Sequence, residues 1–123
     1  MERESTRAIG RDGEEIAAEY LRNNGYRIVE KNYKNRFGEI DVIAKDGNTV
    51  VFIEVKTRNT PSYGTPSSAV DSKKQQRIGK VAVTYLTKKG LTQHPIRFDV
   101  VSICDGEIEV IRDAFELRED FSW

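Results

Sequence analysis

The sequence predicts a single α/β domain with elements in the order α-β-β-β-α-β-β. Two stretches carry apolar residues at helical spacing. Five shorter stretches read as strands, and several of them are separated by turns that contain glycine. At 123 residues the chain is long enough for one hydrophobic core and too short for two. We therefore expect residues 1–123 to form one domain.

The composition excludes several classes of protein. Apolar residues make up 37% and charged residues 33%, with no apolar run long enough to span a membrane. The charged residues 1–7 lack the apolar stretch of a secretion signal, so we expect a cytoplasmic protein that does not bind membranes. One cysteine, Cys104, excludes an internal disulfide, and with a single histidine, His94, it argues against zinc or serine-histidine chemistry.

The first helix is expected from about Arg11–Asn24, after a loose leader at residues 1–9. Residues in a helix turn by 100° each, which places Glu14 on the core-facing side with Ala17 and Leu21. Two explanations stay open. The acid serves a site beside the sheet, or it lies near the helix N-terminus, where the macrodipole favours negative charge.

Three strands are expected next. Tyr26–Tyr33 is a strand of mixed alternation, and residues 34–36 form a basic turn. A β-hairpin follows, with strands Phe37–Ala44 and Val50–Lys56. Acids and a lysine interrupt these otherwise apolar strands. Because buried charges destabilise a sheet, they need an explanation.

The loop Thr57–Ser68 is about a dozen residues long, a length that suggests function or disorder. Thr65 or Ser67 is expected to cap a second helix that has Pro66 in its first turn. This helix is expected to run to about Lys88 or Lys89.

Two stripes follow the second helix, roughly 120° apart. The apolar stripe holds Ile78, Val81, Ala82 and Tyr85, and the basic stripe holds Lys73, Arg77 and Lys80. Lys74 lies at the edge of the apolar stripe, one turn before Ile78. We therefore expect its side chain to point along the sheet rather than into water.

The chain ends with a second predicted hairpin. Ile96–Cys104 is a strand, Asp105-Gly106 a tight turn and Glu107–Arg112 the returning strand. Residues 113–123 are an acidic tail, either a docking segment or a short helix.

Arg97 and Asp99 share one face of the first strand of this second hairpin. We expect a structural ion pair between them, with a supporting role at a functional site as the alternative.

Charge is segregated along the chain although the formal net charge is zero. Residues 56–89 hold eight basic residues and one acid, for a net +7, and residues 99–120 hold eight acids and two basic residues, for a net −6. The first region suits a polyanion such as DNA. A solvated helix face with an acidic tail explains the same pattern.

The first hairpin brings acids together in either of two registers. A Gly47-Asn48 turn places Asp41 opposite Glu54, and an Asp46-Gly47 turn places it opposite Phe52. Both registers put Asp41, Glu54 and Lys56 on one face.

Carboxylates at such a spacing either share a proton or hold a cation, and hard oxygen ligands suit Mg²⁺ or Mn²⁺. Lys56 follows Glu54 on the same face, where its ammonium could orient a water and offset charge on an attacked phosphate. The alternative is an edge-strand ion pair between Glu54 and Lys56, with Asp41 at a frayed strand start.

These residues resemble the PD-(D/E)XK nuclease superfamily. More closely, the chain resembles the YraN-type family of predicted bacterial endonucleases, relatives of archaeal Holliday junction resolvases. The resemblance covers nearly the whole chain, and Ile40 stands where the superfamily motif has proline. The matching motifs are Gly13-Glu14, Asn32-Tyr33, Phe37-Gly38-Glu39-Ile40-Asp41, Phe52-Ile53-Glu54-Val55-Lys56-Thr57-Arg58, Ala69-Val70, Lys74 and Arg97-Phe98-Asp99-Val100-Val101.

The resemblance implies a restriction-endonuclease-like fold, with a mixed central sheet flanked by helices. It implies Asp41 and Glu54 as ligands of Mg²⁺ or Mn²⁺, completed by the backbone carbonyl of Val55. It also implies Lys56 as the catalytic lysine and Glu14 as a supporting acid.

The predicted function is metal-dependent hydrolysis of DNA phosphodiester bonds, at branched or otherwise structured sites. The alternative is a non-catalytic module of the same fold that binds nucleic acid or protein. A homodimer is expected, because cutting two strands symmetrically requires two sites. The predicted DNA contacts are Arg58, Tyr63, Lys73, Lys74, Arg77 and Lys80.

Overall fold

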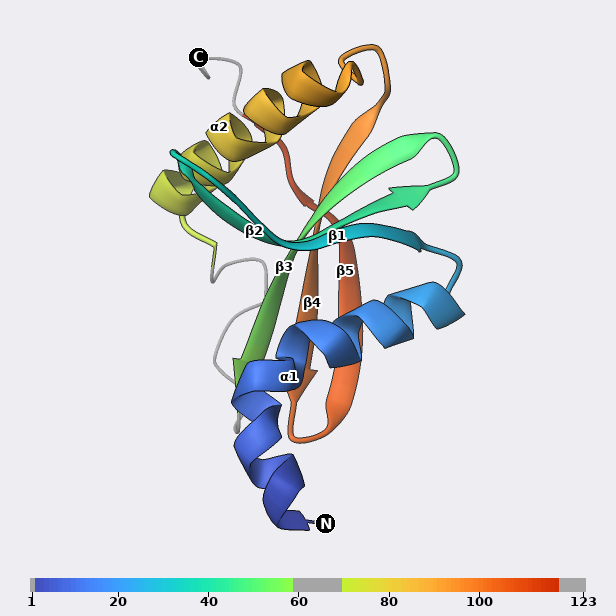
Figure 1. The fold of residues 1–123 in the computed structure, drawn as a ribbon, viewed down its shortest axis with the longest axis vertical. Helices are drawn as coiled ribbons and strands as arrows, with labels where there is room; N and C mark the ends of the chain where they lie inside the picture. Colours follow the sequence, from blue (N-terminus) through green and yellow to red (C-terminus); the bar gives the residue numbers. More distant parts are fainter. Residues whose placement is uncertain (1, 59–69, 118–123) are drawn as a thin grey trace.

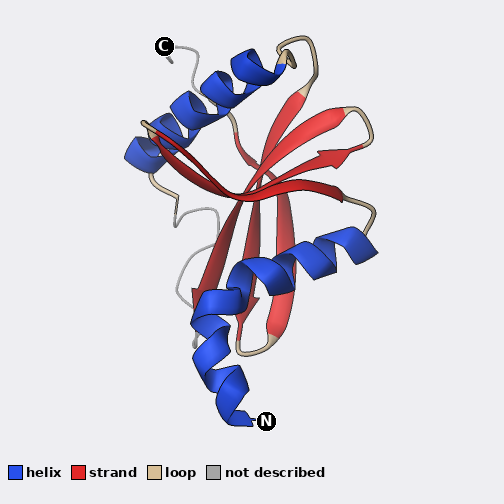
Figure 2. Ribbon diagram, in the orientation of Figure 1, coloured by secondary structure: helices blue, strands red, loops and turns tan. Residues whose placement is uncertain are grey.

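The computed structural model describes residues 2–58 and 70–117, with side chains from Gly13 onward. It confirms the predicted α/β class, element order and restriction-endonuclease-like arrangement (Figure 2). The elements are α1 (Glu2–Asn23), β1 (Arg27–Asn35), β2 (Gly38–Asp46), β3 (Thr49–Arg58), α2 (Ser72–Lys89), β4 (Ile96–Cys104) and β5 (Glu107–Phe115).

The five strands form one mixed sheet in the order β1-β2-β3-β4-β5. β3 and β4 run parallel, and every other neighbouring pair is antiparallel. A parallel pair needs a long crossover, and α2 lies within it. Figure 1 shows a strongly twisted sheet in which β2 curves toward α2.

Each helix covers one side of the sheet with its own hydrophobic cluster (Figure 1). The α2 side is built around Ile43, Phe52, Phe98 and Tyr85, with the Phe52 and Tyr85 rings edge to face at 6.0 Å. The α1 side includes Leu21, Val42, Ile53 and Val101. Buried strand residues therefore alternate between the two clusters, as the pleat requires.

The first helix begins much earlier than predicted. α1 starts at Glu2, so residues 2–9 are helical and the predicted loose leader is wrong. This segment of the sequence lacks a clear apolar stripe, which is why periodicity did not indicate a helix there. It is, however, rich in glutamate and arginine, two residue types that favour helix.

The second helix begins later than predicted, at Ser72. Asp71 is its N-cap, and the Asp71 carboxylate accepts a hydrogen bond from the backbone N–H of Lys74 at 2.9 Å. The predicted cap residues Thr65 and Ser67 and the predicted first-turn Pro66 lie outside the described residues, and α2 as described begins after Asp71 instead. Aspartate is among the strongest N-cap residues, which explains the later start.

Strand ends also differ from the prediction. β1 extends through Asn35, so the basic turn shrinks to Arg36 and Phe37. β4 agrees with its predicted bounds, while β5 continues to Phe115 and takes up the start of the predicted tail. Phe115 pairs with Phe98, and their rings stack at 4.9 Å, which accounts for the extension.

Candidate functional site

Of the two turns that the sequence left open, the first hairpin has the Gly47-Asn48 turn. Asp46 pairs with Thr49, and the β2–β3 ladder runs from there to the pair Val42 and Ile53. Gly47 has φ 63°, a conformation that glycine adopts without strain. The next residue pair along this register is Asp41 and Glu54, which lie just beyond the last paired residues.

β2 changes its alternation at Asp41. Val42 packs on the α1 side and Ile43 on the α2 side, as expected for neighbours. Ile40, however, belongs to the same cluster as Ile43, although strict alternation would place it with Val42. The strand therefore twists around Asp41, at the point where it separates from β3.

The Asp41 carboxylate spans the gap that this separation leaves. Its Oδ2 accepts a hydrogen bond from the backbone N–H of Val55 at 2.8 Å. The side chain thus replaces the missing backbone ladder beyond Ile53 and fixes Asp41 beside the Glu54-Val55 segment. β2 begins at Gly38, so Asp41 is not at a frayed strand start, which removes that part of the alternative explanation.

Asp41 is an unusual carboxyl group electrostatically. The pKa of Asp41 is raised to about 6. Burial of the carboxyl group is the largest cause, and the neighbouring charge of Glu54 is the second. The hydrogen bond from Val55 opposes this rise, while the charges of Glu14 and Glu39 add to it. A carboxylate held this way is stabilised by any cation that reaches it.

Glu54 forms an ion pair with Lys74 of α2, the helix within the crossover from β3 to β4. Lys74 Nζ lies 2.6 Å from Glu54 Oε2, and the side chains are 33% and 12% exposed. Lys74 is in the first turn of α2, and Asp71 holds its backbone. An edge-strand pair of Glu54 with Lys56, the alternative drawn from sequence, is absent from the described ion pairs, and Lys74 takes that place.

For Lys74 the sequence predicted the direction of the side chain but not the residue that it contacts. Its helical phase, one turn before Ile78, indicates that it points along the sheet, and this expectation is confirmed. Its partner was not predictable, because sequence periodicity does not say which strand the helix edge overlies. The Val55 N–H bond to Asp41 has no sequence signal at all.

Glu14 comes to this region from α1. Its negative charge is one of the smaller causes of the raised pKa of Asp41. Gly13 beside it packs closely against β3, where a Cβ atom would lie 2.9 Å from Thr57 Oγ1. Because α1 begins at Glu2, Glu14 is roughly three turns from the N-terminus, and the macrodipole explanation is wrong.

Lys56 follows Glu54 on the α2 side of β3 by the alternation of that strand. The side chain is half-buried, and it has no ion-pair partner in the parts of the chain that the structure describes.

The donor set fits a hard divalent cation with a small number of protein ligands. Across residues 2–58 and 70–117 no three His, Cys, Asp or Glu side chains group as a metal site. Asp41 and Glu54 would supply two carboxylates, and the carbonyl of Val55 would supply a third oxygen. An extended residue directs its N–H and C=O to the same edge of its strand, so this carbonyl lies on the β2 side of β3, as the Val55 N–H does. Mg²⁺ commonly takes few carboxylates and keeps several waters.

The predicted DNA contacts differ in how exposed their side chains are. Lys73 and Arg77 are exposed on α2, and Lys80 is half-buried. The stem of Arg77 passes over Gly38, where a Cβ atom would lie 3.3 Å from Arg77 Cγ. The β1–β2 turn and the basic stripe therefore adjoin.

Arg58 is half-buried at the end of β3. Tyr63 lies outside the described residues, so its predicted contact stays a prediction.

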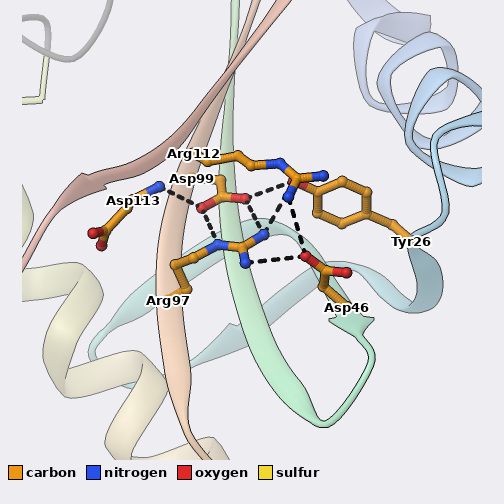
Figure 3. A network of polar contacts seen from close by, with 6 residues as sticks. All are labelled: Tyr26, Asp46, Arg97, Asp99, Arg112 and Asp113. Carbon is orange, nitrogen blue, oxygen red and sulfur yellow. Dashed lines mark hydrogen bonds and ion pairs between the residues drawn. The ribbon is translucent and has the colours of Figure 1, made fainter.

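Asp99 belongs to a separate, structural network (Figure 3). Its buried carboxylate accepts bonds at 2.9 Å from Arg97, the Tyr26 hydroxyl and the Asp113 backbone N–H. Arg97 also contacts Asp46 at 3.0 Å. Burial and the bond to Asp99 raise the pKa of Tyr26 to about 12. The predicted Arg97–Asp99 ion pair is confirmed, and its network joins β2, β4 and β5 to the segment that precedes β1.

The described helices include none that is long and apolar enough to cross a membrane. This agrees with the absence of an apolar run in the sequence.

Comparison with known proteins places the chain in a family. The model of the uncharacterised protein family UPF0102 matches residues 13–103. A UPF0102 protein of Syntrophus aciditrophicus is 53% identical over 112 residues, covering 88% of each chain. A UPF0102 protein of Geotalea uraniireducens is 47% identical over 121 residues, covering 94% of this chain and 95% of the relative. The chain therefore belongs to the uncharacterised protein family UPF0102, the YraN-type family that its motifs predict.

Proposed function

We propose that this protein is a metal-dependent endonuclease that hydrolyses phosphodiester bonds in DNA. The observation that carries the proposal is the pair Asp41 and Glu54 where β2 and β3 separate. Asp41 is held by the Val55 N–H, and its pKa is raised to about 6 by burial and by Glu54. Such carboxylates are stabilised by a cation, and perturbed groups of this kind cluster at functional sites.

Each side chain of the candidate site has a separate role in the proposed reaction. Asp41, Glu54 and the Val55 carbonyl would hold Mg²⁺ or Mn²⁺, an ion that supplies charge neutralisation and Lewis acidity. Lys56, on the same side of β3 as Glu54, offsets negative charge that develops on the attacked phosphate. Glu14 approaches from α1 and adds negative charge that holds the ion.

The surroundings support DNA as the substrate. Lys73 and Arg77 are exposed on α2, the helix that carries the Glu54 partner, and Arg36 is exposed on the adjoining β1–β2 turn. Basic residues on two neighbouring elements can contact successive phosphates, which positions DNA without reading its sequence. The resemblance to junction resolvases implies branched or structured DNA, and two copies of the chain would serve two strands.

Cleavage assays test this proposal. Supercoiled plasmid and a synthetic four-way junction are incubated with Mn²⁺ and wild-type protein, Asp41→Ala or Glu54→Ala. Asp105→Asn is the matched control, because it removes one acid from the exposed β4–β5 turn. We expect cleavage by wild type and control, and a loss of about a hundredfold or more in both site variants, as loss of a catalytic group commonly gives.

Cleavage that survives both site substitutions overturns the assignment of the site. Tight binding of the junction with no cleavage in any divalent metal favours the alternative, a non-catalytic nucleic-acid-binding module. Two observations favour that second candidate: among the described residues no three His, Cys, Asp or Glu side chains are grouped closely enough to hold a metal, and Lys74 already neutralises Glu54.

A physical readout separates the metal site from the activity. If the carboxylates hold an ion, Mg²⁺ raises the melting temperature of wild type by mass action. Glu54→Gln removes that rise. An equal rise in both proteins contradicts the assigned ligands.

A further inference from the structure

The ion pair between Lys74 and Glu54 joins the crossover helix to the separated end of the hairpin. The ammonium lies 2.6 Å from Oε2, and the Glu54 side chain is only 12% exposed. A charge-assisted contact this short is a strong one for a carboxylate with little access to water. Lys74 therefore neutralises the charge of Glu54 in the metal-free protein.

The same carboxylate would be a ligand of a divalent cation bound at the site. Glu54 is next to Asp41 in the hairpin register, and its charge raises the pKa of that neighbour. Any cation that joins the two carboxylates competes with the Lys74 ammonium for Glu54. Ion and ammonium thus compete for the negative charge of one carboxylate.

The backbone of Lys74 is held in place, but its ammonium group is free to move to another partner. Its backbone is fixed at the first turn of α2 by the Asp71 cap at 2.9 Å, while its side chain is 33% exposed. A lysine has a flexible four-carbon stem, so its head can move several ångströms without moving the helix. The exposed Lys73 and Arg77 lie on the same helix, so a phosphate backbone bound by them would lie close to the Lys74 side chain.

We propose that Lys74 is the counter-ion of Glu54 in the metal-free protein, and that a divalent cation displaces its ammonium toward the substrate phosphate. The inference rests on the proposed function, because it uses the same metal ligands. It makes Lys74 a positioning residue that links the two binding events. Metal binding frees a positive charge for DNA, and DNA binding in turn favours the metal-bound state.

Calorimetric titration with Mn²⁺ alone tests the displacement. Lys74→Met keeps the apolar stem and removes the competing ammonium, so the dissociation constant for Mn²⁺ is expected to fall roughly fivefold, as for loss of a partly exposed ion pair. Lys73→Met is the matched control: it removes the same charge one residue away, and we expect a change below about twofold. Lys74→Arg keeps a cation beside Glu54 and is expected to restore nearly wild-type affinity.

The outcomes separate this inference from the proposed function. If wild type binds Mn²⁺, Glu54→Gln does not, and Lys74→Met binds no more tightly than Lys73→Met, Lys74 is no competitor and the inference alone fails. If neither wild type nor Lys74→Met binds Mn²⁺, both ideas fail. Binding by Lys74→Met but not by wild type supports the inference in its strongest form.

A second measurement follows the freed charge. Affinity for a short duplex is measured with and without Ca²⁺, an ion that hard oxygen ligands accept. We expect Ca²⁺ to strengthen DNA binding more in wild type than in Lys74→Met, by about threefold or more. Equal strengthening in both proteins overturns the coupling.

Discussion

Replacing Asp41 by asparagine should stabilise the metal-free protein, although the residue is at the centre of the candidate site. The asparagine side chain would keep the size of the aspartate and an oxygen that accepts the Val55 N–H bond. It would remove the charge that burial and Glu54 disfavour. The substitution therefore isolates the electrostatic cost of the site from its packing.

The magnitude follows from the pKa of Asp41, which rises from 3.8 to about 6. A rise of about two in pKa corresponds to roughly 3 kcal/mol between the charged and neutral forms. Because the folded pKa is above the unfolded one, the folded protein binds the proton more tightly, and stability falls as pH rises from about 4 to about 6. Above this range the full cost is present, so Asp41→Asn is expected to gain roughly 3 kcal/mol at pH 8.

Urea unfolding in EDTA measures this gain at pH 8 and pH 5. At pH 5 the gain should shrink to about half, because most of the wild-type carboxyl is then protonated in the folded state. Asp105→Asn, an isosteric change in the exposed β4–β5 turn, controls for net charge. If Asp41→Asn is no more stable than this control at pH 8, or if its gain does not depend on pH, the assigned electrostatics of the site are wrong.

Three further substitutions test the scaffold, each by urea unfolding at pH 7. Asp99→Asn should lower the free energy of unfolding by about 2 kcal/mol, because it weakens the buried charge pair with Arg97; a loss under about 0.5 kcal/mol would contradict the structural role. Asp71→Ala should lose about 1 kcal/mol through its missing N-cap bond, and Asp71→Ser should recover most of it. Gly38→Ala should lose about 1–3 kcal/mol, since its φ of 146° strains any side chain; an unchanged stability would show that the turn relaxes.

The register of the first hairpin could be predicted from the sequence to within two alternatives. The alternation of β2 and β3 placed Asp41 and Glu54 on one face with either of the two turns, and the structure has the Gly47-Asn48 turn, whose register brings them next to each other just beyond the last ladder pair, Val42 and Ile53. A turn fixes the pairing of the residues that follow it, so the register that brings these two acids together is decided by a short segment. The same reasoning gives the β4–β5 turn at Asp105-Gly106, where both residues have positive φ.

Helix boundaries show where local rules stop. α1 begins at Glu2 although residues 2–9 carry no apolar stripe, and α2 begins after Asp71 although Thr65 and Ser67 are also good caps. Cap preference and helix propensity differ by about 1 kcal/mol or less among such residues, which is too little to choose a boundary from sequence.

By itself, the sequence determined the element order, the two hairpins and the presence of acids on adjacent strands, because each depends on neighbours along the chain. Tertiary structure decided the rest. It placed Lys74, not Lys56, on Glu54, and it separated β2 from β3 so that Asp41 binds the Val55 N–H. Periodicity defines the face of an element on which a residue lies, but packing of helix on sheet decides what that face meets.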